Sequence, residues 1–187
     1  GEANGVQGME LKDNTAMRRI QPGVAGILGL WTPSSAIISP YGLAIALAEN
    51  AHQNGADYRL GYEVVGIAQK GTGQERCFEV FVKGEKKLSS RVVVNSAGLH
   101  ADEVSRMLGI EAPRVWACRG EYYVLDKRLD GSLKTLIYPV PGPNDPGLGI
   151  HLTPTVDGNI LIGPSAVYIP TESRDSYRTT AEIMPTL

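Results

Sequence analysis

The stretch "VVVNSAGLHADE", residues 92–103, is the part of the chain that says most about the fold. Its three valines at residues 92–94 are β-branched and predict a buried strand that runs into Asn95. Small residues follow at 96–98, and an acidic pair at 102–103 marks the first turn of a helix. Small residues at a strand end have two explanations: a tight turn packed under a helix, or a large ligand lying against the backbone.

The segments before this stretch predict a three-stranded meander. The strands are expected at residues 58–69 ("YRLGYEVVGIAQ"), 77–82 ("CFEVFV") and 91–96 ("RVVVNS"), separated by the glycine-containing turns "KGTGQE" and "KGEKK". The lysines of the second turn, Lys83, Lys86 and Lys87, are interpreted as a solvated hairpin tip.

Two helices longer than two turns are expected, at about 39–54 and 100–108. Ser39 can cap the first helix, and Pro40 suits its first position because no N–H is needed there. Gly55 is placed to end this helix in a left-handed turn. Gly109 stands near the end of the second helix.

Beyond residue 112 the pattern is almost entirely that of strands. The runs "RVWACRGEYYVLD", "KTLIYPV", "GLGIHLTP" and "GNILIGP" alternate or are apolar, and Asp157-Gly158 predicts a two-residue hairpin between the last two. Residues 141–147 ("PGPNDPG") predict a loop. The first 37 residues are expected to share a sheet with residues 112–165, so the fold class is α/β in the sense of a mixed α+β structure.

The composition excludes several classes of protein. Net charge is −2 and the pI is about 5.9, which gives no electrostatic basis for binding nucleic acid. No stretch approaches the ~20 apolar residues that a membrane span needs. Cys77 and Cys118 match no metal-ligand spacing and suit a reducing, cytoplasmic compartment. Gly23, Gly26 and Gly29 lack the spacing and the following helix of a dinucleotide-binding loop.

Three segments read together resemble the D-amino-acid-oxidase-like group of flavoproteins. They are "ISPYGLAIALAENAHQNGA", "VVVNSAGLHADEVSRMLGI" and "RGEYYVLD…GLGIHLTPTVDGNILIGPSA". The resemblance is closest to the branch that holds glycerol-3-phosphate dehydrogenases and L-2-hydroxyglutarate oxidases, and it covers roughly residues 20–170. The third segment is the most specific of the three.

The resemblance implies a division of the chain between two domains. Residues 38–111 would form part of an FAD-binding domain that contains the meander. Residues 1–37 and 112–170 would belong to the mixed, largely antiparallel sheet of a substrate domain, and residues 171–187 would begin a truncated helix or linker. The family's phosphate-binding glycine loop is missing, so we expect a fragment that binds FAD weakly or not at all and is inactive alone.

The resemblance also implies roles for single residues. The cofactor-binding candidates are Val64, Asn95, Ser96, Ala97 and Gly98, with core packing and a plain tight turn as the alternatives. Arg119 would bind the anionic group of the substrate, unless it forms a salt bridge to Glu121 or another acid. His151 would take the hydroxyl proton, unless it is an ordinary hydrogen-bonded histidine. Tyr122 or Tyr123 would line the substrate site, but not both, because they point to opposite faces of a strand; Tyr138 is a further candidate.

The intact protein is therefore expected to be an FAD-dependent dehydrogenase or oxidase for a small 2-hydroxy acid or a glycerol-3-phosphate-like substrate. The alternatives are an amine or amino-acid oxidase of the same family and a non-enzymatic binding module. No metal site, nucleic-acid partner or transmembrane segment is expected. Peripheral membrane contact and the identity of the electron acceptor stay open.

Overall fold

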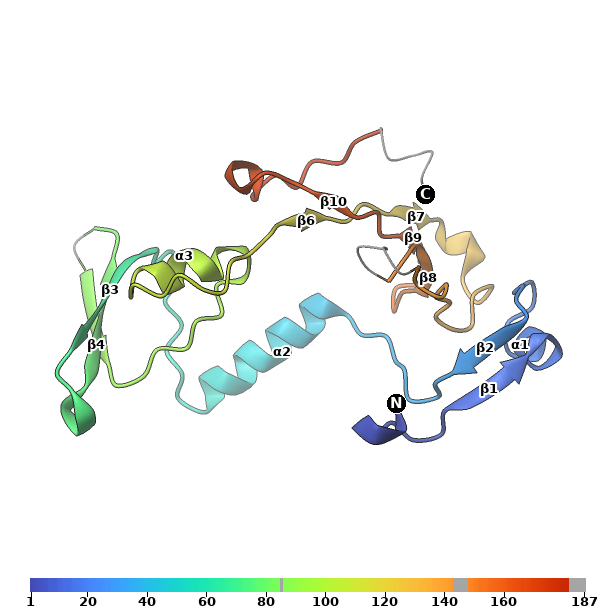
Figure 1. The fold of residues 1–187 in the computed structure, drawn as a ribbon, viewed down its shortest axis with the longest axis horizontal. Coiled ribbons are helices and arrows are strands. Elements are labelled where there is room, and N and C mark those ends of the chain that lie inside the picture. Colours follow the sequence, from blue (N-terminus) through green and yellow to red (C-terminus); the bar gives the residue numbers. More distant parts are fainter. Residues whose placement is uncertain (85, 143–147, 182–187) are drawn as a thin grey trace. The chain divides into compact units, whose positions relative to one another are not determined.

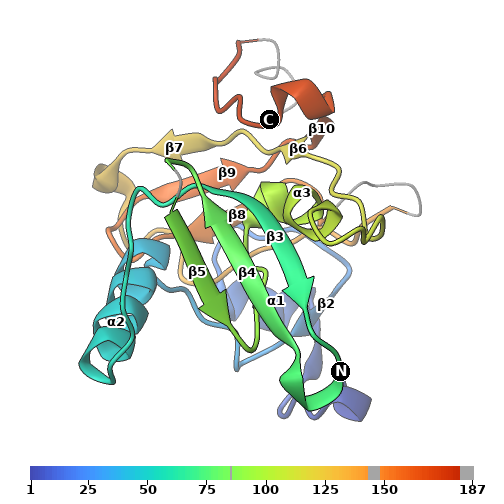
Figure 2. The same ribbon diagram turned by 90° about the vertical axis from the view of Figure 1, so that its left-hand side faces the viewer.

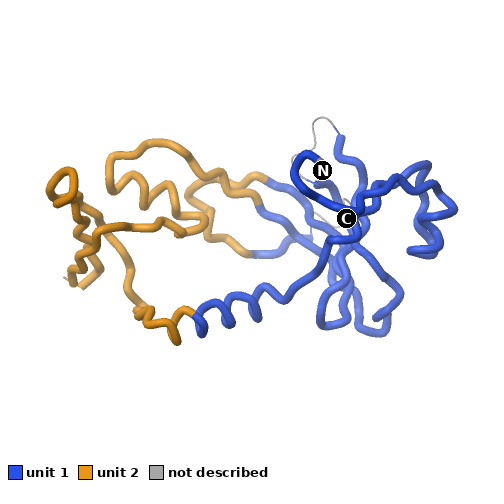
Figure 3. Tube along the Cα trace, turned by 90° about the horizontal axis from the view of Figure 1, so that it is seen from below, with its two compact units in different colours: residues 1–50, 119–167, 178–187 blue, residues 51–118, 168–177 orange. Residues whose placement is uncertain are grey.

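The computed structural model describes residues 1–84, 86–142 and 148–181, and its chain divides into two compact units (Figure 3). Unit 1 comprises residues 1–50, 119–167 and 178–187, and unit 2 comprises residues 51–118 and 168–177. The chain thus passes between the units several times. The predicted domain boundaries at residues 37/38 and 111/112 remain a prediction.

The N-terminal part of unit 1 is a hairpin of two strands with a helix between them (Figure 1). Strand β1 (Glu10–Asp13) pairs antiparallel with β2 (Leu28–Trp31), and α1 (Asn14–Ile20) lies between them in the sequence. The Asp13 carboxylate caps α1 by accepting a hydrogen bond from the Ala16 amide at 2.8 Å. This short helix was not predicted.

A second sheet of unit 1 has the order β7-β9-β8, with all pairs antiparallel. It contains β7 (Tyr123–Leu125), β8 (His151–Pro154) and β9 (Ile160–Gly163). The hairpin between β8 and β9 is confirmed, but its loop is longer than two residues, because the Thr155 amide donates to the Asn159 carbonyl across residues 156–158.

The expectation that the first 37 residues share this sheet is wrong. Strands β1 and β2 pair only with each other among the described residues. The connection through α1 brings them side by side, so that the backbone N–H and C=O groups of each strand bond to those of the other. The predicted strand "KTLIYPV" contributes one isolated bridge, between Ile137 and Leu152. A two-stranded pairing of β6 (Cys118–Arg119) with β10 (Val167–Tyr168) lies where the chain passes between the units.

The predicted first helix is confirmed as α2 (Pro40–Gln53). The Ser39 hydroxyl accepts a hydrogen bond from the Gly42 amide at 3.2 Å, as expected of a cap, and Gly55 ends the helix region at φ +91°. Proline at the first position costs no hydrogen bond, which explains why the start of this helix could be predicted to within one residue.

Unit 2 contains the predicted meander, in the order β3-β4-β5 (Figure 2). The strands are β3 (Val64–Lys70), β4 (Cys77–Val82) and β5 (Lys86–Ser90), and α3 (Ala101–Arg106) contacts β3. The buried apolar side chains of the meander are Ile67 on β3 and Val82 on β4, at 6% and 4% exposure.

Two expectations for unit 2 are wrong. The third strand lies at 86–90 instead of 91–96. The valines at residues 92–94 pair with no other strand among the described residues, so this segment forms no part of the sheet. The second helix is shorter than two turns; the turn before it, η3 (Gly98–His100), is 3-10 helical, and Gly109 closes the region at φ +73°.

Short 3-10 turns complete the described chain. They are η1 (Glu2–Asn4), η2 (Gly73–Glu75), η4 (Lys127–Leu129) and η5 (Thr171–Ser173), besides η3. Most of the predicted loop 141–147 lies outside the described residues. Of residues 171–187, expected to begin a truncated helix or linker, 171–181 contain no α-helix and only the turn η5, and 182–187 lie outside the described residues. In the part of the chain that is described, no helix is long and apolar enough to cross a membrane.

Candidate functional site

A cavity of about 600 Å³ in unit 2 brings together four of the five predicted cofactor-binding residues. Val64 lies at the start of β3, and Asn95, Ser96 and Ala97 form the turn that precedes η3. Apolar side chains supply most of the remaining wall: Ile67, Val80, Val93, Val94, Val104 and Met107. Gly98 is not part of the lining; it follows at φ +56°, a conformation that favours glycine.

The turn beside this cavity is held by the side chain of Asn95. Its Nδ2 donates to the Ala101 carbonyl at 2.7 Å and to the Ser105 hydroxyl at 3.2 Å, and its Oδ1 accepts from the Ala97 amide at 3.2 Å. The asparagine therefore points into its own turn and the start of α3. Residues 95–98 are exposed, so small side chains leave the backbone accessible to a flat ligand.

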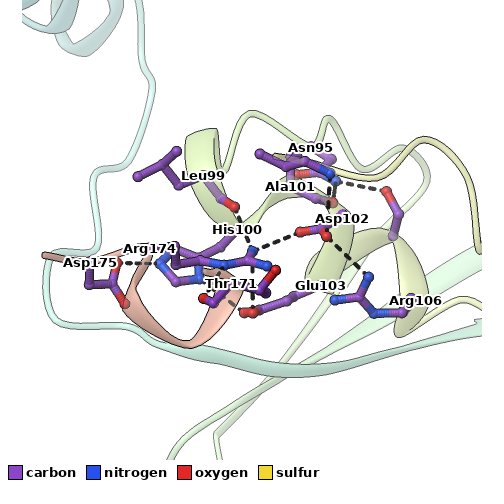
Figure 4. A network of polar contacts seen from close by, with 12 residues as sticks. Asn95, Leu99, His100, Ala101, Asp102, Glu103, Arg106, Thr171, Arg174 and Asp175 are labelled. Atoms are coloured by element: carbon purple, nitrogen blue, oxygen red, sulfur yellow. Dashed lines mark hydrogen bonds and ion pairs between the residues drawn. The ribbon is translucent and has the colours of Figure 1, made fainter. Parts of the chain in front are cut away.

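A network of charged residues adjoins this turn, and sequence reasoning missed it (Figure 4). Asp102 and Arg174 are both 5% exposed and form an ion pair at 2.9 Å. Hydrogen bonding from Arg174, ahead of that from Arg106, holds the pKa of the Asp102 carboxyl well below its usual range against the opposing effect of burial. The i,i+4 spacing of Asp102 and Arg106 was a detectable signal, whereas no local pattern points to Arg174.

His100 joins the same network between two carboxylates. Its Nδ1 lies 2.9 Å from Glu103 Oε2, and its Nε2 lies 2.8 Å from Asp175 Oδ1. Hydrogen bonds to Glu103 and then to Asp175 raise the pKa of His100, because the protonated ring can donate to both. His100 and Glu103 also line the 600 Å³ cavity.

Two of the substrate-side candidates of unit 1, Tyr138 and His151, contact each other. The rings of Tyr138 and His151 stack with centroids 4.2 Å apart and planes at 27°, next to the bridge between Ile137 and Leu152. Burial, and then the neighbouring Tyr138 phenol, raise the pKa of Tyr122. The structure thus stacks Tyr138 on His151, whereas no described hydrogen bond or ring contact joins Tyr122 to either of them.

The His151 ring has a defined orientation. Its Nδ1 lies 2.9 Å from the carbonyl oxygen of Gly149. A carbonyl only accepts hydrogen bonds, so the neutral ring carries its proton on Nδ1 and leaves Nε2 as the basic nitrogen.

Arg119 forms the salt bridge that the sequence left open as an alternative. Its Nε lies 3.4 Å from Glu121 Oε2, but that buried nitrogen makes no hydrogen bond among the described residues. Glu121, at 6% exposure, instead accepts hydrogen bonds from the amide and, at 3.1 Å, from the hydroxyl of Thr180. No described hydrogen bond, ion pair or ring contact joins Arg119 to His151.

Tyr123 lies on β7, where it pairs with Ile162, and is half-buried, while Tyr122 is 45% exposed. The side chain of Tyr122 lies against Gly163, where an added Cβ would come within 2.7 Å of its ring. Among the described residues, no group of three or more histidine, cysteine or carboxylate side chains is arranged to hold a metal ion.

Comparison with known proteins gives concordant matches. The model of the family described as FAD dependent oxidoreductase (DAO) matches residues 1–187. The chain is 32% identical to an L-2-hydroxyglutarate dehydrogenase, named as mitochondrial, from Nematostella vectensis, over 89% of this chain and 39% of that protein. It is 34% identical to a glycerol 3-phosphate dehydrogenase from Caloramator mitchellensis, over 89% of this chain and 34% of the relative.

A solved structure shares the fold. It is the dithionite-reduced L-α-glycerophosphate oxidase from Mycoplasma pneumoniae with FAD bound, with a TM-score of 0.73 and 23% identity over 88% of this chain and 43% of that one. The match thus spans well under half the length of each of these proteins.

Proposed function

The chain belongs to the FAD-dependent oxidoreductase family, and on this premise we propose that it forms part of an enzyme that oxidises a small 2-hydroxy acid or a glycerol-3-phosphate-like substrate. The observation that carries the proposal is the cavity of unit 2, because Val64 and residues 95–97 line it together although they stand far apart in the sequence.

These residues fit one part of a flavin cofactor. Residues 96–97 of the turn have small side chains, the turn is exposed, and the surrounding wall is mostly apolar apart from Glu63, His100 and Glu103, which suits a flat aromatic ring. The chain lacks a glycine loop at a helix N-terminus for the pyrophosphate. In the intact protein this chain would therefore supply one wall of the FAD site. FAD, when bound, supplies the acceptor for the hydride that leaves the substrate carbon.

The chain's own chemistry would come from unit 1. His151 Nε2 would take the proton of the substrate hydroxyl, a role that the Nδ1 bond to Gly149 favours by fixing the tautomer. Arg119 would bind the substrate's carboxylate or phosphate. The ion pair with Glu121 is compatible with this role, because the Glu121 carboxylate already accepts hydrogen bonds from Thr180 and the Arg119 Nε makes none among the described residues.

The finer points of partners and location are part of the proposal. The substrate is a small anion, as the names of the two relatives suggest, and the electron acceptor is left open. A cytoplasmic location rests on the free cysteines Cys77 and Cys118 alone.

The test is reduction of the flavin in the intact protein, followed anaerobically by rapid mixing. L-2-hydroxyglutarate or glycerol 3-phosphate should bleach the flavin absorbance, whereas reduction by an amine or amino acid only would favour the alternative oxidase. A colourless intact protein that takes up no added FAD would favour the binding module.

Variants of Arg119 and His151 test the roles proposed for these two residues in the same assay. Arg119→Ala should weaken apparent substrate affinity about ten- to a hundredfold, since a charged hydrogen bond contributes about 1.5–3 kcal/mol. His151→Ala should slow flavin reduction by about a hundredfold. Arg128→Ala is the control, because that arginine is exposed and, among the described residues, pairs only with Asp126. If both variants behave as the parent does, the two residues are structural.

A further inference from the structure

Residues 168–177, which we call the return segment, go back to unit 2 after the chain has left it at Cys118. Arg174 is the one buried side chain of this segment. Its neighbours in the segment are exposed or half-buried, so apolar burial holds the segment weakly. An arginine is an unusual choice for the most buried position, because a buried charge is stable only when it is paired and hydrogen-bonded.

The Arg174 guanidinium meets several partners at once (Figure 4). Nη1 donates to the Leu99 carbonyl at 2.7 Å and to Asp102 Oδ1 at 2.9 Å, and lies 3.4 Å from Glu103 Oε1. Nε donates to the Thr171 carbonyl at 3.2 Å. One side chain therefore ties the return segment to the turn η3 and to the first turn of α3.

The two faces of α3 have different surroundings. Glu103, Val104 and Met107 line the 600 Å³ cavity. Asp102 and Arg106, one helical turn apart, line a second cavity of about 310 Å³ together with Arg174. Arg174 is thus not part of the first cavity and reaches it only through α3 and the Leu99 carbonyl.

Asn95 and Arg174 both hold the turn that borders the first cavity, and His100 adds its contacts to Glu103 and Asp175. Asn95 binds it locally, through Ala97 and Ala101. Arg174 binds it at Leu99 from 75 residues away in the sequence. We propose that Arg174 is a positioning residue for the flavin site: the return segment fixes residues 96–101 in the shape that receives the cofactor. This inference rests on the proposed function of the first cavity.

The geometry requires arginine rather than a positive charge alone. A lysine could pair with Asp102, but it has no second nitrogen with which to donate to Thr171 while it binds Leu99. Arg174→Lys should therefore restore part, but not all, of what Arg174→Ala removes.

The experiment uses the intact protein and two independent measurements. FAD affinity of the apoprotein is measured by titration, with the visible circular dichroism of the bound flavin as a signature of its environment. Amide hydrogen exchange of residues 98–103 is measured without FAD. Arg178→Ala is the matched control, because Arg178 is an exposed arginine close by in the sequence.

Arg174→Ala should raise the dissociation constant for FAD at least about tenfold, the equivalent of one charge-assisted hydrogen bond. It should alter the flavin dichroism and speed exchange at 98–103, with Arg174→Lys between it and the parent and Arg178→Ala unchanged. If the alanine variant fails to fold, the lysine variant decides by the same measures.

The outcomes separate this inference from the proposed function. Faster exchange with unchanged FAD affinity and dichroism would overturn the positioning role and leave the proposed function standing. A parent protein that binds no FAD would overturn the proposed function, and faster exchange in Arg174→Ala would then still support the anchoring of the turn. Unchanged exchange in both Arg174 variants would refute the anchoring itself.

Discussion

Replacing Asn95 by alanine tests how much this side chain contributes to holding the turn next to the cavity, which Arg174 also binds. The change removes three hydrogen bonds, to the Ala101 carbonyl, the Ser105 hydroxyl and the Ala97 amide. At about 0.5–1.5 kcal/mol net for each bond, the sum is about 1.5–4.5 kcal/mol. Because Asn95 is exposed and water can replace its partners, we expect the lower part of this range, about 1.5–2.5 kcal/mol.

Hydrogen exchange reports this loss locally. The His100 amide, which donates to the Ala97 carbonyl at 3.0 Å, lies within the turn and serves as the probe. A loss of about 1.5–2.5 kcal/mol corresponds to exchange faster by about ten- to seventyfold, since 1.4 kcal/mol is a factor of ten. The measurement is made on the intact protein without FAD, so that the ligand does not mask the opening.

A matched comparison comes from Asn14, whose Nδ2 donates to the Gly26 carbonyl at 2.7 Å, its one side-chain hydrogen bond within the described part of the chain. Asn14→Ala should cost about 0.5–1.5 kcal/mol in its own region and leave His100 unaffected. Asn95→Asp keeps the acceptor for Ala97 but faces the Ala101 carbonyl with a carboxylate, so it should speed exchange about as much as alanine does. If Asn95→Ala changes exchange at the His100 amide by less than twofold, the Asn95 side chain does not stabilise the turn.

Further predictions concern the pH dependence due to His100, two glycines, and FAD binding by the isolated chain. The pKa of His100 is raised, so its stabilising effect, which also involves the facing Glu103 and Asp175 and the nearby Arg174, is complete below about pH 6.5 and lost as the pH rises through the raised value. The protection of residues 98–103, measured as amide exchange relative to the intrinsic rate at the same pH, should fall over that window, and His100→Gln should abolish this fall. Gly163→Ala should lower stability in chemical denaturation by more than about 2 kcal/mol, because φ is +147° and the new Cβ would meet Tyr122 and the Glu121 carbonyl within 3 Å, whereas Gly42→Ala in α2 should raise it by up to about 0.5–1 kcal/mol. The 187-residue chain by itself should take up little FAD in equilibrium dialysis, and stoichiometric uptake would contradict the expectation drawn from the missing glycine loop.

The regular elements that could be predicted from sequence are those whose stabilising contacts are local. Helix α2 has its cap and its proline at adjacent residues and its terminal glycine two residues after its last residue, so both ends are marked locally. Strand β4 coincides with "CFEVFV", and Lys83 and Gly84 lie in its turn to β5, whereas Lys86 and Lys87 belong to β5 itself. The hairpin β8-β9 has Gly158 at φ +85° in its loop.

The errors concern contacts between distant segments. The valine run before Asn95 has the composition of a strand, yet a strand also needs a neighbour for its backbone, and the described chain offers none. The first 37 residues have strand-forming segments, but composition does not say that β1 pairs with β2 alone. The pairing of a strand depends on register and chain path, which no single segment encodes.

For the candidate site, the kind of residue at each position is evident from the sequence: small side chains at 96–98, a histidine and an arginine in apolar runs, and the family resemblance that relates them to a flavin. Which of these residues meet depends on the folded chain: Val64 borders the same cavity as Ala97, His151 stacks on Tyr138, and Arg119 faces Glu121. The anchoring of the turn by Arg174 belongs to the same class. A buried guanidinium is stable only where several acceptors converge on it. For Arg174, the Leu99 carbonyl and the Asp102 carboxylate come from a part of the chain more than seventy residues away.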